Sequence, residues 1–287
     1  MPPVIDFHTH IYPDWLQQNR LKYLGRDNTF AQLFPDQNAR MSTADELILA
    51  MDEDGIDHAV VMGIGWTDPG LAYDVNDYLI ESVRRFPTRL TGFAGVNPKW
   101  GQEAAREADR CALAGLKGIG ELHPDSQDFD LGDYRIMGTL MEVVQERDLI
   151  VTTHSSEPVG HVYPGKGRTT PEILMRFITR YPDVKIVCAH WGGGLLFYSL
   201  MPEIKEALSN VYFDTAASPF LYDLKVFKSG VSLVGSGSIL LGSDYPIIQI
   251  SRLLDQIQEA GLSDPDRNAI IGTNAAKLLG INESFFI

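Results

Sequence analysis

The chain has 287 residues, a formal net charge of −14, 44% hydrophobic residues and 22% charged residues. This mixture is typical of a globular protein and excludes a disordered or fibrous one. The acid excess argues against binding to nucleic acid or to an anionic membrane surface. No apolar run approaches the ~20 residues of a membrane span. The first residues, MPPVIDFHTH, lack the basic and apolar regions of a secretory signal, and the two cysteines make no disulfide framework, so we expect a cytoplasmic protein.

Short apolar runs recur along the chain and predict eight strands. Most of these runs are rich in Val, Ile and Leu without regular polar alternation, as expected for a parallel sheet that is covered on both faces. The strands are expected at Val4–His10, His58–Ile64, Leu90–Asn97, Leu116–His123, Leu149–Ser155, Lys185–His190, Val211–Thr215 and Ile239–Asp244.

Amphipathic stretches between these runs predict helices. The first begins after Thr43, which can form a capping box with Glu46, and runs to Gly55. The others are expected at Leu71–Arg85, Gln102–Ala114, Tyr134–Arg147, Pro171–Tyr181, Met201–Leu208, Gln249–Ala260 and Asp266–Leu279.

Eight strands that alternate with helices predict a (β/α)8 TIM barrel, with one domain over residues 1–287 and an extra helix at the C-terminus. An open doubly wound sheet is the alternative, but no G-x-G-x-x-G follows the first strand. Two long loops, Ile11–Arg40 after the first strand and Glu157–Thr170 after the fifth, would both lie on the C-terminal face of a barrel, where active sites are built.

Five of the seven histidines end predicted strands, whereas His58 begins one. In a barrel the strand ends share one rim, so these side chains would converge. His8 and His10 lie on the same face of the first strand and offer two nitrogen donors for a metal ion. The alternative is a pair of buried histidines that bind the backbone. Asp244 ends the eighth strand as a third candidate ligand, or as a cap for the next helix.

Motifs along nearly the whole chain resemble the amidohydrolase superfamily, in particular the amidohydrolase-related branch that includes aromatic-acid decarboxylases. The resemblance is carried by VIDFHTH ending at His10, by His154, by CAHWGGG containing His190, by LGSDYP containing Asp244 and by NAAKLLG from Asn274. The resemblance implies that His8, His10, His154 and Asp244 bind metal. It also implies that His190 is a further ligand in two-metal members or the catalytic histidine in one-metal members.

Glu121 lies at the end of the fourth strand, where some superfamily branches are similar in using a glutamate to bridge two metals. The decarboxylase-like branch commonly lacks this carboxylate. Glu121 therefore favours a two-metal centre or an acid beside one metal. The alternative is that Glu121 pairs with a cation such as Arg168. His123, two residues later, is either a further site residue or a loop histidine on the rim, and we expect it on the rim.

These residues favour a metal-dependent hydrolase that cleaves an amide, ester or lactone, with Asp244 as the base for water and His190 as a catalytic partner. The alternative is a metal-dependent decarboxylase of an aromatic or unsaturated acid. We expect one or two divalent cations, zinc before manganese or iron. Substrate contacts are expected from His161, Lys166 and Arg168, and a homodimer is compatible with the sequence.

Overall fold

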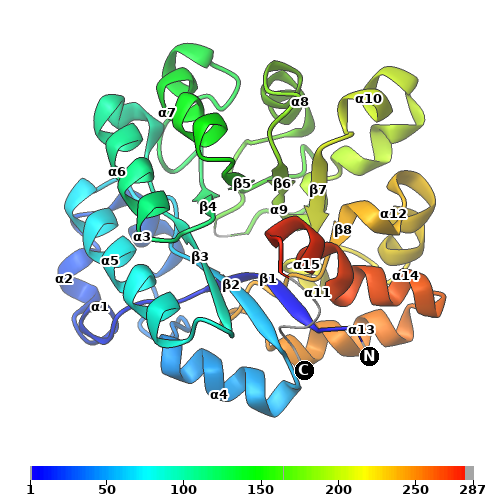
Figure 1. The fold of residues 1–287 in the computed structure, drawn as a ribbon, viewed down its shortest axis with the longest axis horizontal. Helices are drawn as coiled ribbons and strands as arrows, with labels where there is room; N and C mark the ends of the chain where they lie inside the picture. Colours follow the sequence, from blue (N-terminus) through cyan, green and yellow to red (C-terminus); the bar gives the residue numbers. More distant parts are fainter. Residues whose placement is uncertain (1, 164, 282–287) are drawn as a thin grey trace.

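The computed structural model describes residues 2–163 and 165–281. Eight parallel strands follow one another in the order β1 to β8, with helices around them (Figure 1). Backbone bonds from Phe7 N to Leu241 O and from His10 N to Tyr245 O join the last strand to the first. The predicted (β/α)8 barrel is confirmed. Its strands are β1 (Ile5–His10), β2 (His58–Met62), β3 (Leu90–Ala94), β4 (Gly118–Leu122), β5 (Ile150–Thr153), β6 (Ile186–Cys188), β7 (Val211–Asp214) and β8 (Ile239–Leu240).

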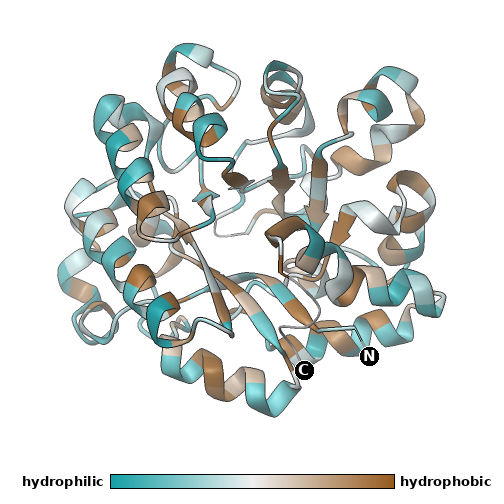
Figure 2. Cartoon of the chain, viewed as in Figure 1, coloured by the Kyte–Doolittle hydropathy of each residue, from teal (hydrophilic) through white to brown (hydrophobic). Residues whose placement is uncertain are grey.

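The interior of the barrel is filled by apolar side chains below the C-terminal ends of the strands. Ile5, Phe7 and Phe93 belong to one buried cluster inside the barrel, and the rings of Phe7 and Phe93 meet edge to face at 5.7 Å. Residues of the C-terminal helix α15 (Asn274–Leu279) join this cluster. A second cluster lies between the strands and the inner faces of the helices, and Figure 2 shows apolar strands surrounded by helices with polar outer faces. Side chains that point into the barrel are therefore supported from below.

The main helices match the predicted ones in place. They are α4 (Ala44–Asp54), α5 (Pro69–Arg85), α6 (Gln102–Leu113), α7 (Tyr134–Glu146), α8 (Pro171–Arg180), α10 (Pro202–Ala207) and α13 (Ile250–Glu259). The capping box before α4 is present, because Thr43 Oγ1 accepts from Glu46 N and the Glu46 carboxylate accepts from Thr43 N. Gly55 ends this helix in the left-handed conformation, at φ 69°.

One helix between β7 and β8 has no counterpart in the prediction. Helix α12 (Val226–Val234) contains Gly230, which is unfavourable inside a helix. A Cβ atom on Gly230 would lie 2.9 Å from the buried Trp191 ring, so packing requires glycine here and outweighs its low helix propensity.

The single C-terminal helix expected at Asp266–Leu279 is interrupted. The structure has α14 (Asp264–Asn268), a π-helical turn at Ala269–Thr273 and then α15. Gly272 lies in this turn, and a Cβ atom there would overlap the Pro3 carbonyl group. The close approach to the segment before β1 accounts for the irregular turn.

The segment expected as a long loop after β1 contains three short helices, α1 (Asp14–Gln18), α2 (Arg20–Tyr23) and α3 (Asn28–Leu33). Asp27 caps α3 and also accepts from the backbone of Thr67 and Asp68, which ties the segment to the loop after β2. Shorter elements are α9 (Ala189–Gly192), α11 (Ser218–Leu221) and the 3-10 turns η1 (Pro98–Trp100), η2 (Leu195–Leu200) and η3 (Ser236–Ser238). Within the described ranges, no helix is long and apolar enough to span a membrane.

Candidate active site

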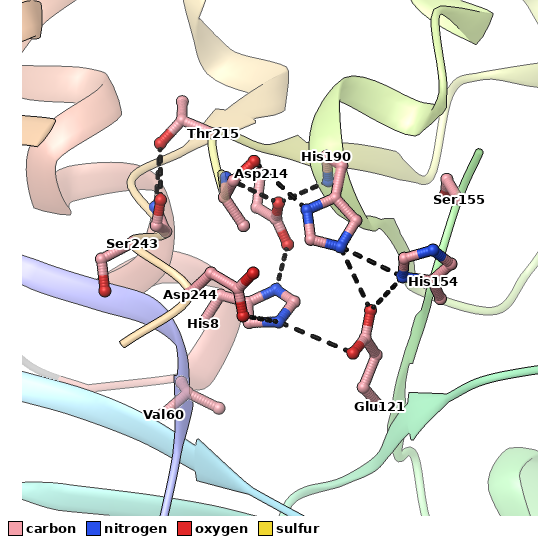
Figure 3. A network of polar contacts seen from close by, with 12 residues as sticks. His8, Val60, Glu121, His154, Ser155, His190, Asp214, Thr215, Ser243 and Asp244 are labelled. Atoms are coloured by element: carbon pink, nitrogen blue, oxygen red, sulfur yellow. Dashed lines mark hydrogen bonds and ion pairs between the residues drawn. The ribbon is translucent and has the colours of Figure 1, made fainter. Parts of the chain in front are cut away.

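Six side chains from five strand ends meet at the C-terminal end of the barrel. His8 and His10 belong to β1 and Glu121 to β4, while the other three follow β5, β6 and β8: His154, His190 and Asp244. All six are at least nine-tenths buried. Their possible ligand atoms form two groups, His8 with His10 and Asp244, and Glu121 with His154 and His190, and the atoms of each group lie within 4.8 Å of one another. Figure 3 shows His8 and Asp244 of the first group facing the second group. The structure thus brings together every side chain predicted as a metal ligand.

In the first group, the imidazole rings of His8 and His10 both use Nδ1 as the hydrogen-bond donor. His8 Nδ1 donates to Asp214 Oδ2 at 2.8 Å, and His10 Nδ1 donates to Gly63 O at 3.0 Å. In its neutral form each ring therefore carries its lone pair on Nε2. These two Nε2 atoms lie only 3.1 Å apart, and Asp244 Oδ1 lies 3.4 Å from the one on His10.

Glu121 connects the two groups. Its Oε2 lies 3.8 Å from the Nε2 atoms of both His8 and His10, and its Oε1 lies 3.2 Å from His154 Nδ1 and 3.5 Å from His190 Nε2. Its partners are these histidines, whereas Arg168 pairs with Asp125 instead. The pairing of Glu121 with Arg168 is therefore excluded.

Electron-rich atoms at such short distances need a positive charge between them. Burial opposes a charge on His8, but Asp214, Glu121 and Asp244 outweigh it and raise the pKa of His8 to about 10. Burial likewise opposes a charge on His190, but its hydrogen bond to Glu121 raises the pKa of His190 to about 9. Nitrogen and carboxylate donors in this arrangement suit a divalent cation, so the residues fit the metal that the sequence predicted.

Asp214, at the end of β7, holds both halves of the site in place. Its Oδ2 accepts from the His8 ring, and its Oδ1 accepts from the backbone nitrogens of His190 and Ala216. His190 has a left-handed backbone, at φ 55°, and its Nδ1 donates to Ala216 O at 3.2 Å. Orienting contacts of this kind fix which ring nitrogen faces the ligand.

Asp6, two residues before His8 in β1, does not contact the His8 ring. Asp6 accepts from the backbone nitrogens of His8 and Ser243 and from the Ser243 hydroxyl, so it supports the backbone of two strand ends. The ring of His8 is oriented by Asp214 instead, because its Nδ1 points toward β7.

A cavity of about 650 Å³ opens onto the six side chains. The segment after β1 contributes Tyr12 and Phe34 to its wall, and the loops after β7 and β8 contribute Phe220 and Ile247. Sequence reasoning missed most of this wall, because an apolar side chain in a loop resembles ordinary packing. Arg40, an exposed residue of the same segment, also reaches the wall.

The loop between β5 and α8 was expected to supply three substrate contacts. His161 and Tyr163 line the cavity. Lys166 Nζ donates to the carbonyl oxygens of Val159 and His161 within its own loop, and the Arg168 side chain is 87% exposed against Asp125. Lys166 and Arg168 are thus not among the residues that line the cavity.

His123 was expected on the rim, and this prediction is wrong. It is 3% exposed, lines the cavity and stacks on His154 with the ring centroids 4.1 Å apart. Burial and the neighbouring His154 lower the pKa of His123 to about 3, so its ring is neutral. Its place directly after Leu122 at the end of β4 was the available signal.

The comparisons with known proteins agree with this geometry. The sequence model of the Amidohydrolase family matches residues 5–281. The chain is 25% identical over 251 residues to the γ-resorcylate decarboxylase of Polaromonas sp. strain JS666, which covers 72% of this chain and 75% of that protein. It is 22% identical to the 2-amino-3-carboxymuconate-6-semialdehyde decarboxylase of Dictyostelium discoideum, with 99% of this chain and 93% of that protein covered.

A similar solved structure is the 5-carboxyvanillate decarboxylase of Novosphingobium aromaticivorans, in complex with manganese and 4-hydroxy-3-methoxy-5-nitrobenzoic acid. The TM-score is 0.76 at 18% identity, and 97% of this chain and 96% of that chain are covered. This likeness shows the shared fold, and the zinc expected first for this chain stays a prediction.

Hydrolysis, the function favoured from the sequence, is wrong, because these relatives are decarboxylases. The argument for hydrolysis depended on Glu121, and a carboxylate among histidines does not by itself distinguish water attack from carbon–carbon cleavage. The match over residues 5–281, together with the strand-end histidines and carboxylates, leads to one conclusion. The chain belongs to the amidohydrolase family, in the branch that contains aromatic-acid decarboxylases.

Proposed function

We propose that this protein is a metal-dependent decarboxylase that removes a carboxylate from a hydroxylated aromatic acid as carbon dioxide. The observation that carries the proposal is that buried residues able to hold a cation line a cavity with apolar and aromatic walls. The decarboxylases to which the chain is similar support the reaction type. The manganese in the carboxyvanillate decarboxylase makes manganese the first cation to test.

His8, His10 and Asp244 are the residues that would hold the cation. Their donor atoms converge, and Asp214 and Gly63 fix the two imidazoles with Nε2 toward Asp244. When bound, a divalent cation there supplies positive charge that attracts the substrate carboxylate and a neighbouring oxygen and stabilises negative charge on them.

His190 is the proposed proton donor. Its Nδ1 is held by Ala216 O, so Nε2 is the nitrogen that carries the exchangeable proton toward the cavity. The Nε2 proton adds to the ring carbon that bears the carboxylate. The bond from that carbon to the carboxylate then breaks, its electron pair restores the aromatic ring, and carbon dioxide leaves. His190 regains its proton from water.

Glu121 and His154 complete the surroundings of this proton donor. Glu121 Oε1 lies 3.5 Å from His190 Nε2 and stabilises its protonated form. A second cation, if Glu121, His154 and His190 bound one, would occupy the same nitrogen. One metal ion per chain by elemental analysis therefore supports the role of His190, and two per chain contradict it.

The cavity walls favour the reaction by excluding water. An apolar wall solvates the carboxylate poorly, whereas the products, carbon dioxide and a phenol, carry no charge. Arg40 at the wall and His161 in the loop after β5 are the groups proposed to attract the anionic acid.

The test is release of carbon dioxide by the manganese-loaded protein from 2,6-dihydroxybenzoate and 5-carboxyvanillate. We expect release from at least one of these acids, and its loss after chelation of the metal. Absence of carbon dioxide from both acids, in protein that is folded and metal-loaded, would overturn the proposal.

A further inference from the structure

His123 has a fixed place in the cavity wall. Its backbone nitrogen donates to Gln127 Oε1 at 2.9 Å, and Gln127 Nε2 donates to the carbonyl oxygens of Trp66 and Val96. One face of the ring stacks on His154. Gly65 lies so close that a Cβ atom there would come within 2.6 Å of the His123 Cβ. The ring is therefore held from several sides and presents one edge to the cavity.

Two contacts fix which ring nitrogen of His123 carries hydrogen. Ser126 Oγ lies 2.7 Å from Gln32 Oε1 and 3.0 Å from His123 Nδ1. An amide oxygen can only accept, so the Ser126 hydroxyl donates its single hydrogen to Gln32. His123 Nδ1 then donates to Ser126 Oγ, and the neutral ring keeps its lone pair on Nε2. Gln32 belongs to α3, so the segment after β1 determines which nitrogen of the His123 ring carries the lone pair.

His123 Nε2 has no hydrogen-bond partner in the part of the chain that the structure describes, although Nδ1 and the backbone nitrogen are both satisfied. This nitrogen is not fully enclosed by protein atoms, so a ligand in the cavity can reach it. An acceptor in an apolar cavity favours a ligand that brings a hydrogen-bond donor and disfavours one that leaves the acceptor unpaired.

We propose that His123 Nε2 accepts a hydrogen bond from a ring hydroxyl of the aromatic acid, and that Ser126 and Gln32 maintain this preference by fixing the tautomer of His123. His123 is thus a specificity residue, and the other two are positioning residues. This assignment rests on the proposed function, because that function places a hydroxylated ring in the cavity. A carboxylate would be repelled at this nitrogen, so the acid group is directed toward the metal ligands instead.

Two acids that differ at one hydroxyl group test the proposal: 2,6-dihydroxybenzoate and 2-hydroxy-6-methoxybenzoate. Binding of each to the manganese-loaded protein is measured by calorimetry, and carbon dioxide release is measured in parallel. We expect wild type to bind the dihydroxy acid about tenfold more tightly, as one neutral hydrogen bond predicts. In His123→Phe, which keeps an aromatic ring for stacking but has no lone pair, the ratio should fall to about one.

The positioning residues have a sharper test. Gln32→Leu frees the Ser126 hydrogen to face His123 Nδ1, which reverses the tautomer and should also lower the ratio to about one. Gln32→Glu keeps an acceptor and should keep the ratio, as should the control Gln37→Leu in the same exposed segment. Nitrogen-15 NMR of the His123 ring should show hydrogen on Nδ1 in wild type and Gln32→Glu, and on Nε2 in Gln32→Leu. A merely structural role would not move this signature.

The outcomes separate the two proposals. If carbon dioxide is released but wild type does not discriminate, or His123→Phe discriminates as well as wild type, the role of His123 is overturned and the proposed function stands. Hydrogen on Nε2 in wild type overturns the role of His123 in the same way. If neither acid binds or releases carbon dioxide, both fall together.

Discussion

His8 and His58 lie in the same pair of strands, at opposite ends of the barrel, and their surroundings shift their pKa values in opposite directions. His8 faces Asp214, Glu121 and Asp244, which raise its pKa to about 10. His58 begins β2, its ring nitrogens contact Thr91 Oγ1 and Thr88 O, and burial lowers its pKa to about 4. The first histidine is surrounded by groups that require a cation, whereas the second is a neutral part of the fold.

This difference teaches that the position of a histidine on a parallel strand indicates its use. At the C-terminal ends, carboxylates from β4, β7 and the loop after β8 converge on the rings. At the N-terminal end, the loop before β3 supplies a backbone partner, because Thr88 O contacts His58 Nδ1. Replacements at the two ends should therefore change different properties.

The largest effect is expected at His190. Replacement by glutamine removes the proton donor but keeps a side chain of similar polarity, so carbon dioxide release should fall about 10²- to 10⁴-fold. The measurement is the turnover rate at saturating substrate, with metal content determined on the same sample. A residual rate within a few fold of wild type would remove His190 from the mechanism. His58→Gln is the matched control and should leave the rate unchanged.

At the other end, His58 should affect stability rather than rate. Its folded pKa of about 4 lies below the ordinary value of 6.5, so the unfolded chain binds the proton more readily. The free energy of unfolding is therefore unaffected by His58 above about pH 7 and falls by up to about 3 kcal/mol between pH 6.5 and pH 4. Urea unfolding at pH 7 and pH 5 measures this loss, which should be smaller in His58→Gln. Equal losses in both proteins would contradict a neutral, buried His58.

Asp214 should affect metal binding. Asp214→Asn weakens the hydrogen bond that fixes the His8 ring, so manganese affinity should fall about 10- to 100-fold. Titration of chelator-treated protein with manganese measures the affinity. The control Asp223→Asn, at an exposed carboxylate between α11 and α12, should bind manganese as wild type does. Unchanged affinity in Asp214→Asn would show that His8 needs no support.

The smallest effects are expected in the loop after β5. Lys166 donates to backbone carbonyls of its own loop and lies over the Tyr163 ring, and Arg168 pairs with Asp125. Lys166→Met and Arg168→Gln should therefore each change KM by less than about threefold. A larger increase in KM with kcat unchanged would mean that these side chains turn into the cavity when substrate binds.

The strand ends could be predicted from the sequence, and the loop walls could not. His8, His10, Glu121, His154, His190 and Asp244 meet as expected, because the ends of parallel strands share one rim. The direction of Lys166 depends on carbonyl oxygens within its own loop. The place of His123 depends on Ser126 and Gln127, which are held in turn by Gln32, Trp66 and Val96 from distant segments. Local sequence does not encode such contacts.

The reaction type was the other failure, and its cause is physical. Metal ligands bind a cation, and its positive charge can assist either water attack or the loss of carbon dioxide. The cavity wall that separates these outcomes comes from Phe34, Phe220 and other loop residues, whose positions only the fold reveals.

Turnover of 2,6-dihydroxybenzoate in heavy water tests the account most directly. We predict that the manganese-loaded protein releases one carbon dioxide per product and places one deuterium on the carbon that carried the carboxylate, and that His190→Gln loses both signals together. Consumption of the acid without carbon dioxide, or full activity in His190→Gln, would contradict the account.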